Sequence, residues 1–170
     1  IDDSLMTEGV GSTPFDAEGV PGQRTVIAEK GVLQGYLYDR RSALRENIDS
    51  TGSARRSSFR SLPAIGASNL FLEPGPASPQ DMIKGIDRGL YITDVMGMHT
   101  INSVTGDFSL GASGLLIKKG QLGTPVRGVT IAGNIQKLFA GIDLVGNDIR
   151  FYGSRGAPSI RVQGLSIGGK

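Results

Sequence analysis

The chain has 170 residues but no cysteine, no tryptophan and a single histidine, His99. Without cysteine there is no disulfide framework and no thiolate for metal binding or nucleophilic catalysis. His99 has no second histidine with which to share a metal, and we interpret it as a hydrogen-bonding loop residue. We therefore predict no catalytic residues and no metal site in this chain. The lack of cysteine also fits a cytoplasmic location.

Long apolar runs and a strong net charge are missing too. No apolar stretch approaches the ~18 residues that a membrane helix needs, so we expect no membrane contact. The first residues, Ile1–Ser4, lack the regions of a signal peptide, and the first residue is not methionine, so we expect a fragment of a longer protein. The net charge is only +2, which indicates no broadly basic surface for nucleic acid.

Glycine, by contrast, is abundant, with 26 residues, about twice the average share. Hydrophobic residues make up 38% of the chain and aromatic residues 6%, so we expect a core of Ile, Leu and Val on short strands. The length predicts one domain over residues 1–170. The predicted class is mainly β, a β-rich α+β fold, in which antiparallel twisted sheets form a barrel-like or sandwich domain with two or three short flanking helices.

Two segments have the pattern of a β-hairpin with glycine in the turn. Lys30-Gly31 and Lys119-Gly120 each lie between apolar arms, where glycine supplies a positive φ at low cost. Their likeness indicates either an internal repeat or the recurrence of one favourable turn, and we favour recurrence. Further strands are expected at residues 67–72, 90–95, 107–117, 126–132, 149–152 and 159–167.

Helices are predicted to be few and short. Ser78 has the position of an N-cap for a helix that ends by Gly89. Two more helices are expected at Asn134–Gly141 and, with a weaker pattern, at Arg40–Asn47. The segment Ser50–Gly66 has no usable period and is rich in Ser, Arg and Gly, so we predict a long loop there.

Several motifs occur in a fixed order along the chain. They are PFDAEGVP at 14–21, GVLQGYLYDR at 31–40, STG at 50–52, RGLYIT at 88–93, VTGDFSLGASG at 104–114, PVRGVTIAGN at 125–134, VGND at 145–148 and APSIRVQGLSIGG at 157–169. In this order the motifs resemble the C-terminal region of the TldD/PmbA family, known as modulators of DNA gyrase and as metallopeptidase components. The resemblance covers the chain from about residue 7 to its end.

The resemblance also shows what this chain lacks. Catalytic members of the family hold zinc with an HExxxH helix upstream of this region and a cysteine near the C-terminus. Here Tyr152–Ser159 passes straight to the final strand, without the cysteine-bearing insertion. The chain is therefore similar to the PmbA (TldE) type, which implies a non-catalytic domain in a TldD/TldE-type metallopeptidase complex that processes or degrades peptides. Zinc is then expected only in a TldD-like partner subunit, although self-association is an alternative to that heteromer.

The candidate contact residues lie in the glycine-rich segments. A glycine-rich sheet edge accepts an extended peptide as an added strand, reading its backbone. We therefore expect contact with peptide or partner at Gly106, Asp107, Phe108, Ser109, Gly114, Arg127, Gly128, Gly133 and Asn134.

An arginine cluster gives a second candidate surface. Arg55, Arg56 and Arg60 are expected to be exposed in the isolated domain and to contact a partner or an anion. Clustered cations also bind phosphate, which supports an alternative function, a regulatory module that modulates DNA gyrase, close to DNA. Because no aromatic stacking pattern accompanies the arginines, we favour a protein partner over DNA or gyrase.

Two other patterns favour structural roles. Asp16 with Glu18, and Asp107 with Ser109, have no neighbouring histidine or lysine base, so we favour hydrogen bonding to the backbone over catalysis. Gly164–Lys170 matches the phosphate-loop pattern GxxxxGK but lacks the following serine or threonine and the helix. We therefore predict that this segment is the end of a close-packed terminal strand.

Overall fold

A computed structural model describes residues 1–169, so Lys170 of the GxxxxGK pattern lies outside the described residues. Backbone contacts divide the chain into two compact units. Unit 1 comprises Ile1–Glu73 with Ile149–Ala157, and unit 2 comprises Pro74–Asp148 with the segment from Pro158 onward. Strands outnumber the three short α-helices of the described residues, so the prediction of a β-rich α+β fold is confirmed. That residues 1–170 form a single domain stays a prediction.

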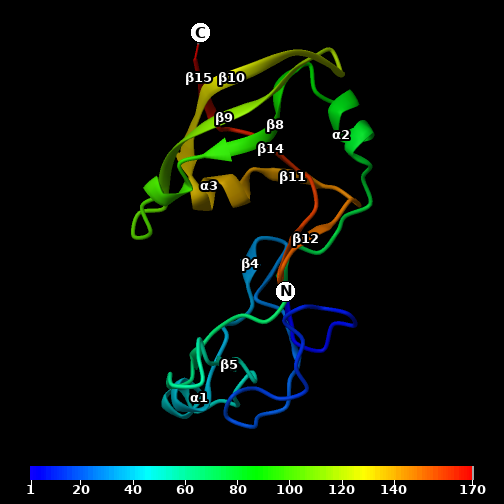
Figure 1. Ribbon diagram of the computed structural model, residues 1–170. Helices are drawn as coiled ribbons and strands as arrows, with labels where there is room; N and C mark the ends of the chain where they lie inside the picture. The colour runs from blue at the N-terminus through cyan, green and yellow to red at the C-terminus, as the bar shows by residue number, and fades with distance from the viewer. Residues whose placement is uncertain (170) are drawn as a thin grey trace. The chain divides into compact units, whose positions relative to one another are not determined.

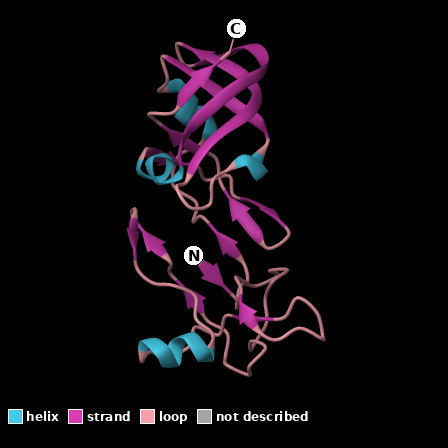
Figure 2. Cartoon of the chain, turned by 90° about the vertical axis from the view of Figure 1, so that its left-hand side faces the viewer, coloured by secondary structure: helices cyan, strands magenta, loops and turns pink. Residues whose placement is uncertain are grey.

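Unit 2 is built around a four-stranded antiparallel sheet (Figures 1 and 2). Its strands are β8 (Arg88–Met96), β9 (Asp107–Lys118), β10 (Gln121–Asn134) and β15 (Ser166–Gly168), in the order β15-β10-β9-β8. β9 therefore has a partner on both sides, whereas β8 and β15 are edge strands. The sheet is strongly twisted in Figure 2, and none of the sheets within residues 1–169 closes into a barrel.

The β9–β10 hairpin forms where the sequence predicted it. Lys119 and Gly120 make a two-residue turn with φ values of 49° and 74°. Positive φ at both positions is the type I′ geometry, which matches the twist of the flanking strands. A Cβ on Gly120 would lie 2.8 Å from the carbonyl oxygen of Lys84, so packing requires glycine here as well.

The apolar core of unit 2 follows the alternation of β9. Phe108, Leu110 and Ala112 point to one side of the sheet and are buried together with Ile131 of β10. Partly buried side chains surround these four, namely Leu90, Ile92, Val95, Ile101, Val129, Leu138 and Leu165. The core is thus mostly aliphatic, as the composition predicted.

Helix α2 (Pro79–Lys84) begins where the sequence predicted. The side chain of its N-cap, Ser78, accepts a hydrogen bond from the backbone N–H of Asp81 at 3.1 Å. The helix ends at Gly85, four residues before the predicted Gly89, because strand β8 starts already at Arg88.

Helix α3 (Ile135–Ala140) begins after Asn134 and ends at Gly141, which confirms the prediction. It leads into β11 (Ile142–Val145), a strand that the sequence reasoning missed. β11 pairs antiparallel with β14 (Ile160–Val162), and the two form a separate two-stranded sheet. A short 3-10 helix, η1 (Met98–Thr100), follows β8.

Unit 1 has shorter strands and one helix. Its five-stranded sheet has the order β12-β13-β7-β1-β2, and β3–β4 and β5–β6 form two separate ribbons. The strands are β1 (Asp2–Asp3), β2 (Arg24–Thr25), β3 (Ala28–Glu29), β4 (Val32–Leu33), β5 (Ala54–Arg55), β6 (Ala64–Ile65), β7 (Leu70–Phe71), β12 (Arg150–Tyr152) and β13 (Arg155–Ala157). Helix α1 (Arg40–Glu46) is capped by Asp39 and ends at Asn47, as predicted.

The second predicted hairpin is the β3–β4 ribbon. Lys30 and Gly31 form its turn with φ values of 49° and 80°, close to those of Lys119 and Gly120. A Cβ on Gly31 would meet nothing within 4 Å. The same turn therefore occurs once in each unit, packed against a helix in unit 2 and open in unit 1.

The interior of unit 1 is polar. Its buried polar side chains are Asp2, Ser4, Asp16, Ser53, Ser68 and Asn69. Asp16 accepts hydrogen bonds from the backbone N–H groups of Glu18 at 2.8 Å, Val20 at 3.0 Å and Ala54 at 3.0 Å. The predicted backbone role of Asp16 is thereby confirmed.

Two predicted segments differ from the structure. Ser50–Gly66 is not one long loop, because β5 and β6 pair within it across residues 56–63. The strand predicted at 159–167 is divided into β14 and β15 by Gly164, whose φ of 81° interrupts an extended backbone. Within residues 1–169, no helix combines the length and the apolar character needed to cross a membrane.

Candidate functional site

The nine candidate contact residues of the glycine-rich segments all lie on or beside one strand pair, β9–β10, in unit 2. The sheet register places Asp107 opposite Asn134 and Phe108 opposite Gly133. Farther along the same pair, Gly114 lies opposite Val126, beside Arg127. The structure therefore brings the candidates together as two clusters, one at each of these places on the pair.

The first cluster is a hydrogen-bonded cap. The Asn134 side-chain NH₂ donates to Asp107 Oδ1 at 2.9 Å and to the carbonyl oxygen of Thr105 at 2.8 Å. Asn134 Oδ1 accepts from the N–H of Gln136 at 3.0 Å, which caps α3. The hydrogen bond from Asn134, followed by one from Thr105, holds the pKa of Asp107 below its usual value. Asp107 thus has a structural role, as the sequence reasoning favoured, but its carboxylate bonds side chains and not the backbone.

A shallow hollow lies beside this cap. It has a volume of about 380 Å³ and is lined by Thr100, Asp107, Phe108 and Ser109. The ring of Phe108 nevertheless belongs to the buried core, so this residue supports the hollow and offers little surface for contact. Asp107 and Ser109 are exposed there and remain candidate contacts.

The expectation of a free sheet edge is wrong for β9 from Gly111 onward. There β9 pairs with β8 as well as with β10, so its backbone groups are bonded on both sides, whereas Asp107–Leu110 pair with β10 alone. Gly114 is buried, and a Cβ there would collide with the carbonyl oxygen of Tyr91. The glycine allows close strand packing and does not mark a peptide-binding edge.

The second cluster lies at a bulge on β10. The register shifts between Arg127 and Val129, where Gly128 has a φ of 71°. β15 covers β10 only at Thr130–Ala132, so the outer edge of β10 is uncovered beside Arg127. Arg127 and Gly128 are exposed and keep their place as candidate contacts.

The arginine cluster divides into one half-buried and two exposed residues. Arg55 Nη1 donates to Thr13 Oγ1 at 2.7 Å, and Arg55 Nε is buried with no hydrogen-bond partner within residues 1–169. The expectation that all three arginines are exposed is therefore wrong for Arg55, which strand β5 draws into unit 1. Arg56 and Arg60 are exposed, and the Arg60 guanidinium lies 5.1 Å from the Phe59 ring centroid.

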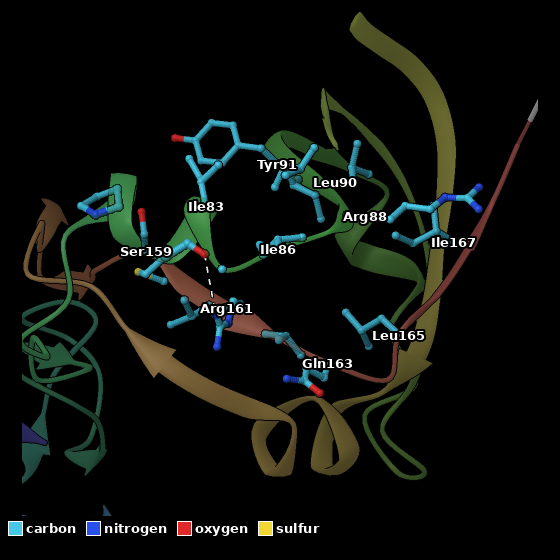
Figure 3. Close-up of a pocket in the computed structure, with 18 of the residues that line it drawn as sticks. Ile83, Ile86, Arg88, Leu90, Tyr91, Ser159, Arg161, Gln163, Leu165 and Ile167 are labelled. Atoms are coloured by element: carbon cyan, nitrogen blue, oxygen red, sulfur yellow. Dashed lines mark hydrogen bonds between the residues drawn. The ribbon is translucent and has the colours of Figure 1, made fainter. Parts of the chain in front are cut away.

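A larger feature that the sequence reasoning missed is a groove of about 970 Å³ in unit 2 (Figure 3). In Figure 3 Ile83, Ile86 and Leu90 lie on one side of the groove, and Arg161, Gln163 and Leu165 lie on the other. The buried side chains of Ile117 and Ile131 also line it. The apolar stripe of α2 was a signal for this groove, but on its own it also fits ordinary core packing.

One wall of the groove is fixed by a charged cluster. Arg161 Nε donates to Asp143 Oδ1 at 2.9 Å and to Oδ2 at 3.1 Å, and Arg161 Nη2 donates to Oδ2 at 2.8 Å. Gln163 Nε2 donates to Asp143 Oδ2 at 2.6 Å. The bonds from Arg161 hold the pKa of Asp143 below its usual value, and Asp143 raises the pKa of Arg161. Arg161 Nη1 also donates to the carbonyl oxygen of Met82 at 3.4 Å, across the groove (Figure 3).

The residues present do not fit a zinc site. The chain has no cysteine, and its one histidine, His99, is exposed. Within the described part of the chain, no three His, Asp or Glu side chains gather in a way that could hold a metal ion. No chemical step through a metal follows from this chain's own residues.

Relatives and solved structures resemble this chain over nearly all of its length. It is 33% identical to a metalloprotease TldD homolog of Buchnera aphidicola, covering 99% of this chain and 38% of the relative. It is also 33% identical to metalloprotease PmbA of Escherichia coli O157:H7, covering 97% of this chain and 34% of that protein. The chain thus spans between a third and two fifths of these relatives.

Two crystal structures share the fold. One, a candidate modulator of a DNA gyrase from Thermotoga maritima, gives a TM-score of 0.89 at 38% identity, over 98% of this chain and 38% of that protein. The other, TldE from Thermococcus kodakarensis, gives 0.87 at 28% identity, over 99% of this chain and 39% of that protein.

The two kinds of relative align differently. The alignment with the TldD homolog extends over 184 positions, more than the 170 residues of this chain, so the homolog carries inserted residues. The alignment with PmbA extends over 165 positions and covers 97% of the chain, so it is nearly free of insertions. Residues 1–169 match the family described as PmbA/TldA metallopeptidase C-terminal domain. The chain belongs to this TldD/PmbA family, as its C-terminal domain.

Proposed function

We propose that this chain is the C-terminal domain of a PmbA/TldE-type subunit, which is non-catalytic and works with a TldD-like metallopeptidase subunit on peptides. The observation that carries the proposal is the absence of cysteine, because the resemblance implies that a catalytic subunit carries a zinc-binding cysteine within this region and this chain has none. The nearly insertion-free alignment with PmbA supports the same subunit type.

In this proposal the domain contributes contact surface and not catalytic groups. The uncovered edge of β10 beside Arg127 and Gly128 presents unpaired backbone groups to a partner or a peptide. Asp107 and Ser109 border the hollow on the same strand pair. Zinc and the water that it activates belong to the TldD-like subunit, in the cytoplasm.

The test is co-purification of the full-length protein with the TldD-like protein of the same organism, followed by a peptide-cleavage assay and metal analysis. We expect the two to form a heteromer, and cleavage to require the TldD-like subunit and its zinc. A full-length protein that holds about one zinc per chain after dialysis, or that cleaves peptide alone, would overturn the proposal.

The exposed arginines separate a protein partner from DNA. Changing Arg56 and Arg60 to alanine should weaken the heteromer while leaving the unfolding free energy nearly unchanged, because both side chains are exposed. The matched control is Arg41→Ala, an exposed arginine on α1. The double variant could instead lose a salt-sensitive binding to duplex DNA while the heteromer stays intact. That result would favour the gyrase-modulating alternative over a role of these arginines in the peptidase heteromer.

A further inference from the structure

The groove of unit 2 is bounded by strand edges, and this decides what it can hold. Successive residues of a strand point to opposite faces, so a strand that turns one face to a groove lines it with every second residue. Here consecutive residues line the groove, Arg88–Ile92 on one side and Pro158–Leu165 on the other. The edges of β8 and β14 therefore face the groove. This agrees with the strand order, because β8 is an edge strand and β14 pairs only with β11 within the described residues.

The hydrogen bonds show which backbone groups of β8 are free. The N–H of Lys119 donates to the carbonyl oxygen of Asp87 at 2.7 Å, so the backbone of Asp87 faces β9. In an antiparallel pair the direction alternates, and Gly89 and Tyr91 face β9 too. The N–H and C=O groups of Arg88, Leu90 and Ile92 then point away from β9. Those three residues present a row of unpaired donors and acceptors, which is what an added strand binds.

The side chains of the groove select an apolar occupant. Ile83, Ile86, Leu165 and Ile167 line it without a charge. The charge of Arg161 is neutralised by Asp143, so it makes little demand on a ligand. The groove thus suits a chain segment whose inward side chains are aliphatic.

Cations outnumber anions around one end of the groove, where Arg88 and Asp87 line it and two lysines lie beside them, outside the lining. Arg88 lies at this end, next to Ile167 in Figure 3, and is directly opposite Lys118 in the sheet. Like charges opposite one another on a strand pair are unfavourable. Asp87 lies at the same end, but Lys119 adds a third cation in the adjoining turn. An anion beside Arg88 would relieve this repulsion.

We propose that the groove binds an extended apolar peptide, added as an antiparallel strand to the free edge of β8, with a carboxylate beside Arg88. Antiparallel addition continues the pattern of this sheet and brings the C-terminal end of the peptide to Arg88, the first residue of β8. Five residues of β8 line the groove, from Arg88 to Ile92, which at about 3.3 Å per residue accommodates a peptide of about five residues. This inference rests on the proposed function only in taking a peptide as occupant.

The test uses the protein and a six-residue peptide of alternating valine and threonine with a free C-terminus, followed by fluorescence anisotropy. The control peptide carries N-methyl groups on alternate backbone amides, so its side chains are unchanged while its strand-forming N–H groups are removed. We expect saturable binding of the first peptide and a loss of at least about tenfold in affinity for the second. Equal affinity for both would overturn the proposal.

Amide hydrogen exchange tests the direction of the backbone. The amides of Arg88, Leu90 and Ile92 should exchange fast in the free protein and become protected by peptide, while those of Gly89 and Tyr91 are protected throughout. No change at the first three amides at saturating peptide would contradict strand addition. If concentration alone protects them and sedimentation shows a dimer, the occupant is a second copy of the chain and the proposal is wrong.

Two variants test the apolar lining of the groove and the pairing of Arg88 with the peptide carboxylate. Ile160 of β14 also lines the groove, and Ile160→Lys should weaken binding at least about tenfold, because it adds a charge to this apolar lining. Its matched control is Phe139→Lys, at an exposed residue of α3 outside the groove lining. Arg88→Gln should weaken the free-acid peptide about two- to fivefold and leave its amidated form unchanged. Equal losses for both forms would refute the role given to the carboxylate.

These binding assays need no partner subunit. A failure of strand addition can therefore be distinguished from a failure of the proposed function.

Discussion

The two units of this chain bury opposite kinds of side chain. All the buried polar side chains within the described residues lie in unit 1, where Asp16 and Asn69 are examples. The large buried apolar side chains, such as Phe108 and Ile131, lie in unit 2. Unit 1 is therefore held by directional hydrogen bonds, and unit 2 by apolar burial.

This difference follows from strand length. β9 and β10 of unit 2 are long enough for alternation to bury a continuous apolar face, whereas most strands of unit 1 have two residues. Short strands leave many loop N–H groups to satisfy. Side chains such as Asn69 do this, with Oδ1 accepting from the N–H of Gly11 at 2.8 Å and the NH₂ donating to the carbonyl oxygen of Asp3 at 2.8 Å.

The largest effect is expected in the core of unit 2. Phe108→Ala should lower the free energy of unfolding by about 3–5 kcal/mol, because it removes a buried ring and leaves a cavity. Phe139→Ala, at a 61% exposed ring, is the matched control. Denaturant unfolding measures both. Equal losses in the two variants would contradict the assignment of the core to Phe108.

The next effect tests the polar interior of unit 1. Asp16→Ala removes the acceptor for three backbone N–H groups and should cost about 2–3 kcal/mol. Asp49→Ala, at an exposed carboxylate, should cost almost nothing. Hydrogen exchange, read separately for each unit, should show faster opening in unit 1. Destabilisation confined to unit 2 would contradict the conclusion that buried hydrogen bonds hold unit 1 together.

The shared turn offers a matched pair across the units. Gly31→Ala should cost about 1 kcal/mol, because only the positive φ opposes alanine there. Gly120→Ala should cost about 2 kcal/mol or more, since its Cβ would also press on the carbonyl oxygen of Lys84. Thermal unfolding of the two variants measures the difference. A larger loss for Gly31→Ala than for Gly120→Ala would mean that α2 moves to accommodate the added methyl group.

A smaller effect should depend on pH. Asp143→Asn should cost about 1 kcal/mol at neutral pH, since it weakens the bonds to the partly buried Arg161. The pKa of Asp143 is lowered in the folded chain, so this stabilisation is present above the unfolded-state pKa of about 3.9. It is lost as the pH falls through the folded-state pKa. Unfolding free energies of wild type and variant should therefore differ by a constant amount from about pH 5 upward and converge in acid; a difference that persists there would argue against the ion pair.

The smallest effect concerns the arginines of unit 1. Arg56→Ala and Arg60→Ala should each change the unfolding free energy by less than about 0.5 kcal/mol, as expected for exposed side chains. Arg55→Ala should cost more, because its guanidinium bonds Thr13 and its stem is half buried. Chemical denaturation of the three single variants gives the ranking. Three equal values would contradict the placement of Arg55.

The sequence predicted the features that depend on local chemistry. Both Lys-Gly turns, the N-caps Ser78 and Asn134 and the strands of the β9–β10 hairpin lie where their patterns placed them. Pairing between distant segments has no such local signal. The sequence therefore contains no local signal for β11 beside β14, for the half-buried Arg55 or for the groove. It also does not reveal that β9 is paired on both sides from Gly111 onward.

Arg161 joins the two walls of the groove, because one guanidinium bonds Asp143 of β11 and the carbonyl oxygen of Met82 at the opposite side. The width of the groove is thereby set before any ligand arrives. Binding then requires little rearrangement of the protein, so less of the binding free energy is spent on ordering the groove. Association should then be limited by collision and orientation, with a rate that rises in proportion to ligand concentration and shows no plateau from a slow opening step.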